Sequence, residues 1–368
     1  MDIYCSDIVA FMEKLAPPYL AEDWDNSGLI LGNSKQRVRS IMTCLSVTSK
    51  VVEEAVDRKV DILISHHPLI FRGITAINEK DGKGRLIYRL IRNGISVYCA
   101  HTNLDAAEEG VNDSLAKALG LKEIRNLKRH MVERLYKVVV FVPEENTDMV
   151  RDAMCRAGAG WIGNYSHCTF ASIGTGTFKP LAGTKPYIGR QGELEKVAEC
   201  RLETVVPDSR LKSVLDAMLE VHPYEEVAYD VYSLELNAKE YGMGKVGFLK
   251  PPQRFETFIN FLKTSLGVSH VRIVGDVKHD IEKVAVFCGS FDDKIIGLLE
   301  RDTDILVTGD LRYHTAVDMV EAGFCVVDAG HFNTEHLIVR KLMEILSERF
   351  PDIDVVSSVA EEDPFRYY

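Results

Sequence analysis

Short apolar runs that alternate with helix-forming segments constrain this chain more than any other feature. The run at 60–65 is close to continuously apolar, as are 305–307 and 325–327. Such runs are typical of strands covered on both faces. The expected strands are 41–47, 60–65, 95–100, 284–289, 303–309 and 325–330, and the expected helices are 7–16, 48–58, 85–93, 111–119, 291–301, 313–322 and 334–349. This alternation predicts an α/β fold in which helices flank a mostly parallel sheet.

The middle of the chain follows a different order. Its pattern of strand, helix, two strands, helix and strand is that of a ferredoxin-like unit. The segments are 136–142, 148–157, 169–177, 195–206, 209–220 and 227–234. We therefore predict an inserted α+β ferredoxin-like domain at 128–236, and one discontinuous domain formed by 1–127 and 237–368. The polar flanks at 122–134 and 235–245 are candidate linkers.

Charge and hydropathy exclude several classes of function. The formal net charge of -11 leaves no excess of basic residues to neutralise phosphates, which argues against a nucleic-acid-binding protein. No apolar run approaches the roughly 20 residues of a membrane span, and the first residues lack the features of a signal peptide. The eight cysteines are scattered without a CxxC pair, so reduced thiols are expected. These features predict a cytoplasmic protein with no membrane partner.

Histidines and carboxylates follow four of the expected strands. In an open α/β sheet, ligands gather beyond the carboxyl ends of the strands, so these side chains meet if the strands are neighbours. They are His66 and His67, His101 and Asp105, Asp310 and His314, and His331 and Glu335.

Each of these residues has an alternative explanation when it is taken alone. His331 and Glu335 are four residues apart, so on a helix they share a face and could be a surface pair. Asp105 could cap a helix, although it lies far upstream of the helix expected at 111–119. Taken together, His66, His67, Asp105, His331 and Glu335 form a mixed nitrogen and oxygen set that suits zinc first, with manganese or iron as alternatives. Five ligands suit two ions about 3.5–4 Å apart better than one closed zinc site.

The remaining residues near the strand ends are assigned supporting roles. His101, Asp310 and His314 are expected to orient ligands or to move protons in catalysis. For His314, an exposed helix histidine is an equal alternative. The stretch 23–28 either borders the crevice or is a polar loop. The leading hypothesis is a metal-dependent hydrolase with a small-molecule substrate. The alternative is a non-enzymatic protein of metal storage, delivery or regulation, in which the insert senses a ligand.

Several motifs resemble those of a known family. They are Ser65-His66-His67-Pro68, Ala100-His101-Thr102-Asn103-Leu104-Asp105, Gly309-Asp310-Leu311-Arg312-Tyr313-His314, Gly330-His331-Phe332-Asn333-Thr334-Glu335 and Trp24-Asp25-Asn26-Ser27-Gly28. The chain resembles the GTP cyclohydrolase 1 type 2 homologues, also called Nif-three-like dinuclear-metal proteins, and its middle resembles the CutA- and PII-like insert of the longer bacterial members.

The resemblance carries expectations of its own. It implies that the same five residues bind the two metal ions of each subunit, with Asp105 and Glu335 as bridges. It also implies a homohexamer and opening of the guanine ring of GTP, so that the substrate would be a nucleotide.

Overall fold

The chain forms two compact units. The computed structural model describes residues 2–277 and 279–366. Unit 1 comprises Met1–Met131 and Tyr241–Tyr368, and unit 2 comprises Val132–Glu240. Among the described residues, no helix is both long enough and apolar enough to cross a membrane.

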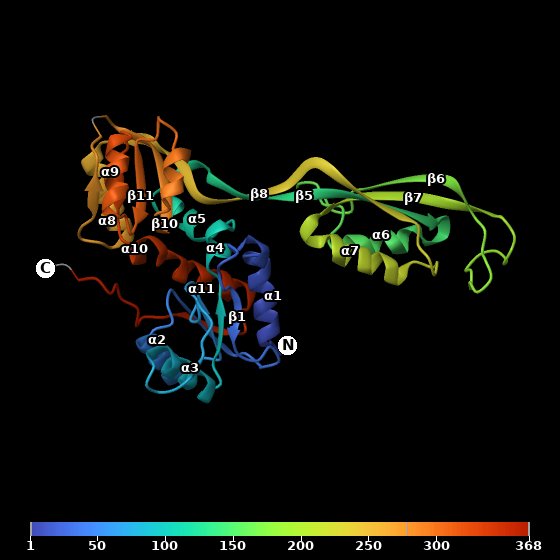
Figure 1. Cartoon of the computed structure of the whole chain (residues 1–368), viewed down its shortest axis with the longest axis horizontal. Coiled ribbons are helices and arrows are strands. Elements are labelled where there is room, and N and C mark those ends of the chain that lie inside the picture. Colours follow the sequence, from blue (N-terminus) through green and yellow to red (C-terminus); the bar gives the residue numbers. More distant parts are fainter. Residues whose placement is uncertain (1, 278, 367–368) are drawn as a thin grey trace. The chain divides into compact units, whose positions relative to one another are not determined.

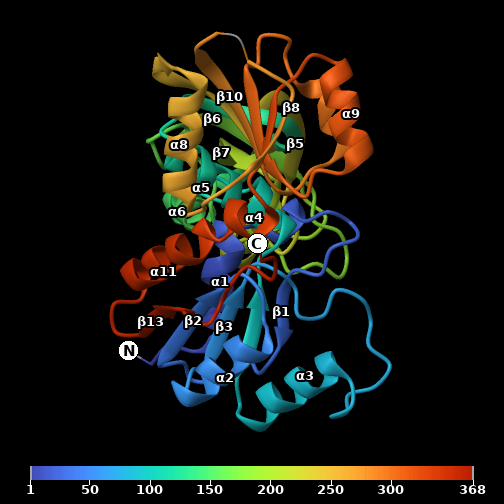
Figure 2. The same ribbon diagram turned by 90° about the vertical axis from the view of Figure 1, so that its left-hand side faces the viewer.

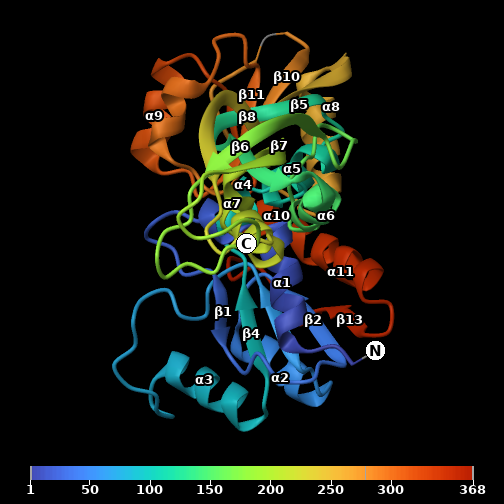
Figure 3. The ribbon, with the colours of Figure 1, turned by 90° about the vertical axis from the view of Figure 1, so that its right-hand side faces the viewer.

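The first sheet of unit 1 has five strands. Their order across the sheet is β1 (Gly28–Leu31), β4 (Ser96–Cys99), β3 (Ile62–Ser65), β2 (Ser40–Cys44) and β13 (Asp354–Ser357). The edge strand β1 is antiparallel to β4, and the other pairs are parallel. Figures 2 and 3 show this sheet from opposite sides.

Helices cover both faces of this sheet because its strands are apolar on both sides. Along β3, Ile62 and Ile64 contribute to one buried cluster and Leu63 to another, as the two-residue period of a strand requires. The cluster of Leu63 includes side chains of α2 (Ser49–Asp57) and α3 (Gly82–Arg92). The cluster of Ile62 and Ile64 includes side chains of α1 (Cys5–Leu15) and α11 (Leu337–Arg349).

The second sheet of unit 1 is built around three parallel strands. These are β10 (Ile281–Ser290), β11 (Ile305–Gly309) and β12 (Val326–Asp328). They are flanked by two antiparallel strands, β8 (Tyr229–Gln253), of which the C-terminal part pairs with β10, and β9 (Arg272–Val274). In Figures 2 and 3, α8 (Phe255–Leu266) and α9 (Tyr313–Glu321) lie on opposite sides of this sheet.

One continuous core joins the two sheets. Val284 and Ile305 of the second sheet share a buried cluster with Ile41 and Ile62 of the first. Helices α5 (Val111–Ala118) and α10 (His331–Glu335) contact β10, and α11 contacts β2, β13 and α5. The predicted α/β class with helices flanking the strands is confirmed, but the parallel strands form two sheets. The apolar runs of both sheets are alike, so the sequence pattern does not reveal which strands pair.

Unit 2 contains an antiparallel sheet with helices on one of its faces. Strand β7 (Glu195–Pro207) pairs with β6 (Thr169–Phe178) on one side and with β5 (Lys122–Pro143) on the other. Figure 1 shows α6 (Thr147–Arg156) and α7 (Asp208–Val221) against this sheet. Val140, Met154, Leu202 and Met218 are members of the buried cluster between them.

Two details of local structure differ from the sequence pattern. The flanks at 122–134 and 235–245 contain the boundaries between the two units and are extended strand within β5 and β8, because backbone groups form the strand pairing and polar side chains do not prevent it. The helix expected at 291–301 is a short 3-10 helix at Asp293–Leu298. Within the described residues, Pro18–Leu20 and Glu144–Asn146 are also short 3-10 helices.

Candidate metal centre

Residues from the ends of both sheets of unit 1 form one cluster. Three overlapping groups of side chains have ligand atoms within 4.8 Å of one another and could hold a metal ion. The histidine–carboxylate cluster consists of His66, His67, His101, Asp105, His331 and Glu335. His66 and His67 follow β3, His101 follows β4, Asp105 lies in α4 (Thr102–Ala106), and His331 and Glu335 lie in α10.

The backbone holds the paired histidines in place. The backbone N–H of His66 donates to the Cys44 carbonyl oxygen at 3.1 Å, and that of His67 donates to the Leu45 carbonyl oxygen at 2.8 Å. These bonds extend the pairing of β3 with β2 past the end of both strands. Pro68 then favours an extended backbone at His67. Both imidazoles therefore reach the same side of the strand end.

Each imidazole of the cluster is oriented through its Nδ1 atom. His66 Nδ1 donates to the Ala100 carbonyl oxygen at 2.8 Å, and His67 Nδ1 is hydrogen-bonded to the Ser46 hydroxyl at 2.7 Å. His331 Nδ1 donates to Asp310 Oδ2 at 2.7 Å.

His101 follows the same rule, because its Nδ1 donates to Asp25 Oδ1 at 2.7 Å. Metal-binding histidines are held by this kind of outer hydrogen bond, which fixes the tautomer and leaves Nε2 for the metal.

Glu335 lies between two of the groups and faces both. Its Oε2 atom lies 2.9 Å from His67 Nε2 and 3.0 Å from His331 Nε2. Its Oε1 atom lies 3.8 Å from His66 Nε2, which in turn lies 3.7 Å from Asp105 Oδ1. The two oxygens of one carboxylate are therefore directed at two different sets of ligand atoms.

Two buried atoms of the cluster show that the residues fit a cation. His66 Nε2 and Asp105 Oδ1 are buried and have no hydrogen-bond partner among the described residues. Buried polar atoms are rarely left unpaired because the loss of hydration is costly. A cation bonded to both atoms, at the 2.0–2.2 Å or so that is usual for zinc with nitrogen or oxygen, would satisfy them.

A glycine provides the space for Glu335. Gly289, in β10, has a φ of +67°, and a Cβ atom added to it would lie 2.1 Å from Glu335 Oε1. The backbone N–H of Gly289 donates to the Thr334 hydroxyl at 3.1 Å, which ties β10 to α10 beside the carboxylate. Asp310 also has a positive φ of 48°. Both residues thus have a positive φ, a backbone conformation that is uncommon for residues other than glycine. Both lie next to the cluster.

The cluster combines opposite charges that stabilise one another. Burial lowers the pKa of His66, but the carboxylates of Asp105 and Glu335 outweigh this effect and raise it to about 9. Burial likewise opposes protonation of His331, whose pKa rises to about 9 through Glu335 and Asp310. Burial raises the pKa of Glu335, but hydrogen bonds from the neighbouring histidines bring it well below its usual range. Ionised carboxylates at this depth would attract divalent cations.

Asp25, whose role the sequence pattern does not decide, belongs to this site. Asp25 Oδ2 accepts hydrogen bonds from the backbone N–H of Thr102 at 3.0 Å and from its hydroxyl at 2.5 Å, in addition to the bond from His101 to Oδ1. Burial raises the pKa of Asp25, but these bonds lower it well below its usual value. The stretch 23–28 therefore borders the cluster. In the sequence, the polar residues beside Trp24 were the feature that pointed to it. Ser46 carried no signal in the sequence.

The predicted supporting residues differ in their positions. Asp310 contacts His331, and His101 lies inside the cluster. His314 is exposed in α9, where its ring contacts Tyr313, and it is in none of the three groups. A role for His314 stays a prediction.

A cavity of about 500 Å³ adjoins the cluster within unit 1. His67, His331 and Asp310 line it, together with Arg272 and Phe332. This volume lies within the range of ligand pockets, which is about 300–1,000 Å³. The cluster is thus accessible to a small molecule.

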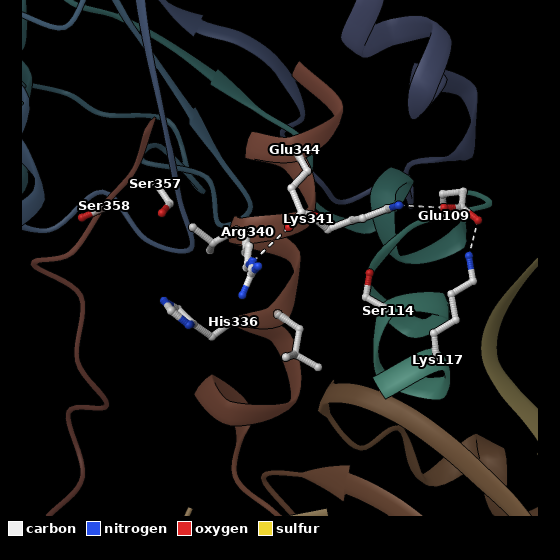
Figure 4. A pocket seen from close by; sticks show the side chains of 11 residues that line it. Glu109, Ser114, Lys117, His336, Arg340, Lys341, Glu344, Ser357 and Ser358 are labelled. Carbon is white, nitrogen blue, oxygen red and sulfur yellow. Dashed lines mark hydrogen bonds and ion pairs between the residues drawn. The ribbon is translucent and has the colours of Figure 1, made fainter. Parts of the chain in front are cut away.

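A second hollow of unit 1 is lined by ion pairs instead. Figure 4 shows Lys117 of α5 and Lys341 of α11 both directed at Glu109, and Arg340 beside Glu344. The side chains of Arg340 and Glu344 are 2.9 Å apart. Its charges are matched within the chain, whereas His66 Nε2 and Asp105 Oδ1 of the cluster have no hydrogen-bond partner among the described residues.

Comparisons with known proteins match nearly the whole chain. The family model described as Duf34/NIF3 (NGG1p interacting factor 3) matches residues 3–364. A relative from Halalkalibacterium halodurans named GTP cyclohydrolase 1 type 2 homolog is 41% identical over 364 residues, which cover 98% of both chains. A Bacillus subtilis relative with the same name is 42% identical over 363 residues, covering 98% of this chain and 97% of the relative.

Solved structures agree with these matches. The crystal structure of a Bacillus cereus protein related to NIF3 has a TM-score of 0.90 and 40% identity, and the match covers 100% of this chain and 99% of that one. The resemblance inferred from the motifs is confirmed, and the chain belongs to the Duf34/NIF3 family.

Proposed function

We propose that this protein binds two divalent metal ions in the histidine–carboxylate cluster and uses them for hydrolysis. The observation that carries the proposal is the position of Glu335, whose Oε2 faces His67 and His331 while its Oε1 faces His66. A carboxylate directed at two ligand sets is suited to bridge two ions about 3.5–4 Å apart.

The ligand sets divide naturally between two ions. His67, His331 and Glu335 would hold one ion, and His66, Asp105 and Glu335 the other. Mixed imidazole and carboxylate ligands favour zinc, with manganese or iron as alternatives. Each set supplies three side chains, so positions remain open for water or substrate, as is usual for catalytic rather than structural sites.

The chain supplies the groups that a hydrolytic reaction needs around the metal ions. Two bound cations would lower the pKa of a water molecule towards neutrality and polarise the bond under attack. His101 would accept a proton from that water; in support, one of its ring nitrogens lies within 4.8 Å of ligand atoms of His66 and His67. Asp25 would stabilise the resulting imidazolium through its bond to Nδ1. Asp310 holds the orientation of His331.

The substrate we propose is GTP: one water adds at C8 of the guanine ring and the ring opens to a formamide, and a second water hydrolyses that formamide to release formate. Two observations support this choice. Relatives at about 40% identity are named GTP cyclohydrolase 1 type 2 homolog. The cavity beside the cluster is lined by Arg272, a side chain type that binds phosphates and that here also pairs with Asp328, and by Phe332, an aromatic ring on which a base can stack.

The decisive experiment measures product release by metal-loaded protein. The metal-free chain is reloaded separately with zinc, manganese or iron and incubated with GTP, and formate and phosphate are quantified. We expect formate from the loaded wild type and none from His66→Ala, while His167→Ala, an exposed histidine of unit 2, retains the wild-type rate. If the loaded protein releases neither formate from GTP nor phosphate from any nucleotide tested, the hydrolase proposal fails, and metal storage or delivery becomes the better explanation.

We further propose that the protein assembles into a homohexamer. In support, α3 exposes 45% of Tyr88 and 54% of Ile91, which is apolar surface that contact between copies would cover. Light scattering coupled to size-exclusion chromatography tests this directly, since the hexamer has six times the chain mass of 41.3 kDa. A monomer mass at micromolar concentration would contradict it.

A further inference from the structure

Unit 2 contains a cavity of its own, of about 260 Å³. It lies beside the end of β6 at Phe178, between the following segment 179–188 and the segment 222–228 that joins α7 to β8. All of its lining residues belong to unit 2, so it is independent of the metal centre. Its volume suits a molecule smaller than a nucleotide.

Aromatic rings gather around Tyr224 in this cavity. The rings of Phe178 and Tyr224 have centroids 5.8 Å apart with an interplanar angle of 60°, and those of Tyr187 and Tyr224 are 6.2 Å apart at 55°. The three rings are inclined to one another and all line the cavity. Aromatic rings that line a cavity can attract a cation to their electron-rich faces.

A buried carboxylate lies beside the same rings. Glu199, in β7, is only 9% exposed, and its Oε1 accepts a hydrogen bond from the Tyr224 hydroxyl at 2.9 Å. A Cβ atom on Gly176 would lie 1.9 Å from Glu199 Oε2, so the bare glycine makes room for this oxygen. The hydrogen bonds of the described residues include none to Oε2. A buried carboxylate needs compensation, and Oε2 is left with an acceptor position to offer.

Most of the charged side chains that line the cavity are acidic. Glu199, Glu225 and Glu226 line the cavity, whereas Lys179 is the single lysine or arginine among its described lining residues. The Glu225 side chain also accepts a hydrogen bond from the backbone N–H of Lys185 at 3.0 Å. This bond fixes the loop that closes one side of the cavity. Anionic ligands are therefore disfavoured.

His222 fixes the position of Tyr224. His222 Nε2 donates to the Phe141 carbonyl oxygen at 3.1 Å, and its Nδ1 accepts the backbone N–H of Tyr224 at 3.1 Å. The segment that carries Tyr224 is thus anchored to β5, and the aromatic ring is preorganised before any ligand binds. Preorganisation reduces the entropy lost on binding.

We propose that unit 2 binds a small primary ammonium ion in this cavity, with its N–H groups directed at Glu199 and its alkyl chain among the rings of Phe178, Tyr187 and Tyr224. A primary rather than a quaternary ammonium is the better match, because Glu199 Oε2 is a hydrogen-bond acceptor and needs a donor. The small volume of the cavity indicates a free amine of a few carbon atoms.

The proposal is tested with butylammonium and its neutral counterpart butan-1-ol, which has a chain of the same length. Saturation-transfer NMR on the full chain measures the affinity of each probe. We expect butylammonium to bind at least tenfold more tightly than butan-1-ol. In Glu199→Gln, which keeps the shape of the side chain but removes its charge, we expect this preference to disappear.

Two further variants control for net charge and for the contribution of the aromatic ring. Glu220→Gln changes the net charge by the same amount at an exposed position of α7 outside the cavity, and it should bind butylammonium as the wild type does. Tyr224→Leu should weaken binding at least tenfold while circular dichroism shows an unchanged fold. Equal affinity for the two probes, or wild-type binding of butylammonium by Glu199→Gln, would overturn the proposal. So would the absence of binding by wild-type protein.

Discussion

His67 Nε2 and Glu335 Oε2 lie 2.9 Å apart although 268 residues separate them in the chain. His67 belongs to the five-stranded sheet, and Glu335 belongs to the helix that follows β12 of the second sheet. The cluster therefore connects the two sheets of unit 1 at the carboxyl ends of their strands. A metal ion bound there would connect them as well.

Removal of the metal should destabilise unit 1. A ligand present at 100 times its Kd stabilises the native state by about 2.7 kcal/mol, and we expect a chelator to lower the Tm by about 5–10 °C. Differential scanning calorimetry before and after chelation, with zinc re-addition as the control, measures this change. An unchanged Tm in protein shown to have lost its metal would contradict it.

His66→Ala should lower the metal content from two ions per chain to about one. The substitution removes a ligand from the set that contains Asp105 but leaves His67, His331 and Glu335 in place. Inductively coupled plasma mass spectrometry on dialysed protein gives the ratio. His167→Ala serves as the control and should keep two ions, and a ratio of two in His66→Ala would exclude His66 as a ligand.

Gly289→Ala should disrupt the cluster through Glu335. The new methyl group would lie 2.1 Å from Glu335 Oε1, so the carboxylate must move, and we expect metal affinity to fall at least tenfold. Gly323→Ala is a matched control, because Gly323 has a φ of +80° and nothing within 4 Å of the added atom. Both variants carry the backbone strain of a positive φ, about 1 kcal/mol. Equal metal affinity in the two would show that contact with Glu335 is unimportant.

Asp310→Asn should weaken metal binding without removing a ligand. Asn tolerates the positive φ of Asp310 but cannot accept the His331 Nδ1 hydrogen bond as a carboxylate does. Loss of such an outer partner typically costs 10–100-fold in metal affinity, and we expect a change of about that size. Competition with a fluorescent zinc chelator measures it. Wild-type affinity would mean that Asp310 does not position His331.

Unit 2 should lose stability as the pH falls below neutrality because of His222. Burial lowers the pKa of His222 below 6.5, so the folded state favours the neutral ring. This contribution to the stability of unit 2 is fully present above pH 6.5, and it is lost as the pH falls through the lowered pKa of His222 in the folded state. The neutral ring accepts a hydrogen bond from the Tyr224 N–H at Nδ1. Protonation would place a hydrogen on Nδ1 and so break this bond.

Hydrogen exchange, corrected for its intrinsic pH dependence, tests this expectation at pH 7 and pH 5. Segments around 141 and 224 should become less protected at pH 5 in the wild type, and the change should be smaller in His222→Gln, which does not titrate. The same pH dependence in both proteins would assign the effect to other groups.

Much of the fold could be predicted because buried strands have a clear signature. The apolar runs at 60–65 and 303–309 correspond to β3 and β11, and the family resemblance rested on the polar residues that follow such strands. Their pairing could not be predicted, because an apolar run satisfies either sheet equally well. The strands expected at 136–142 and 227–234 correspond to parts of β5 and β8, but the extension of these strands into 122–134 and 235–245 was missed because the side chains there are polar.

The candidate site was predictable in part. That histidines and carboxylates gather beyond strand ends could be predicted, but not that they come from two different sheets. The assignment of the ligands and of the ions stays a prediction. The role of Ser46 depends on a contact between neighbouring strands that local sequence does not encode. The interpretation of 128–236 as an inserted ferredoxin-like domain also stays a prediction.

The position of β13 has a consequence for biosynthesis. This strand, Asp354–Ser357, pairs in parallel with β2, Ser40–Cys44. A ribosome that adds about 5–20 residues per second would translate for about 15–60 seconds between the two. Throughout that interval the nascent chain carries β2 with an unfilled edge, which is a site where strands of other chains can add. Chaperone protection of this edge during translation would then decide how much of the newly made protein escapes aggregation.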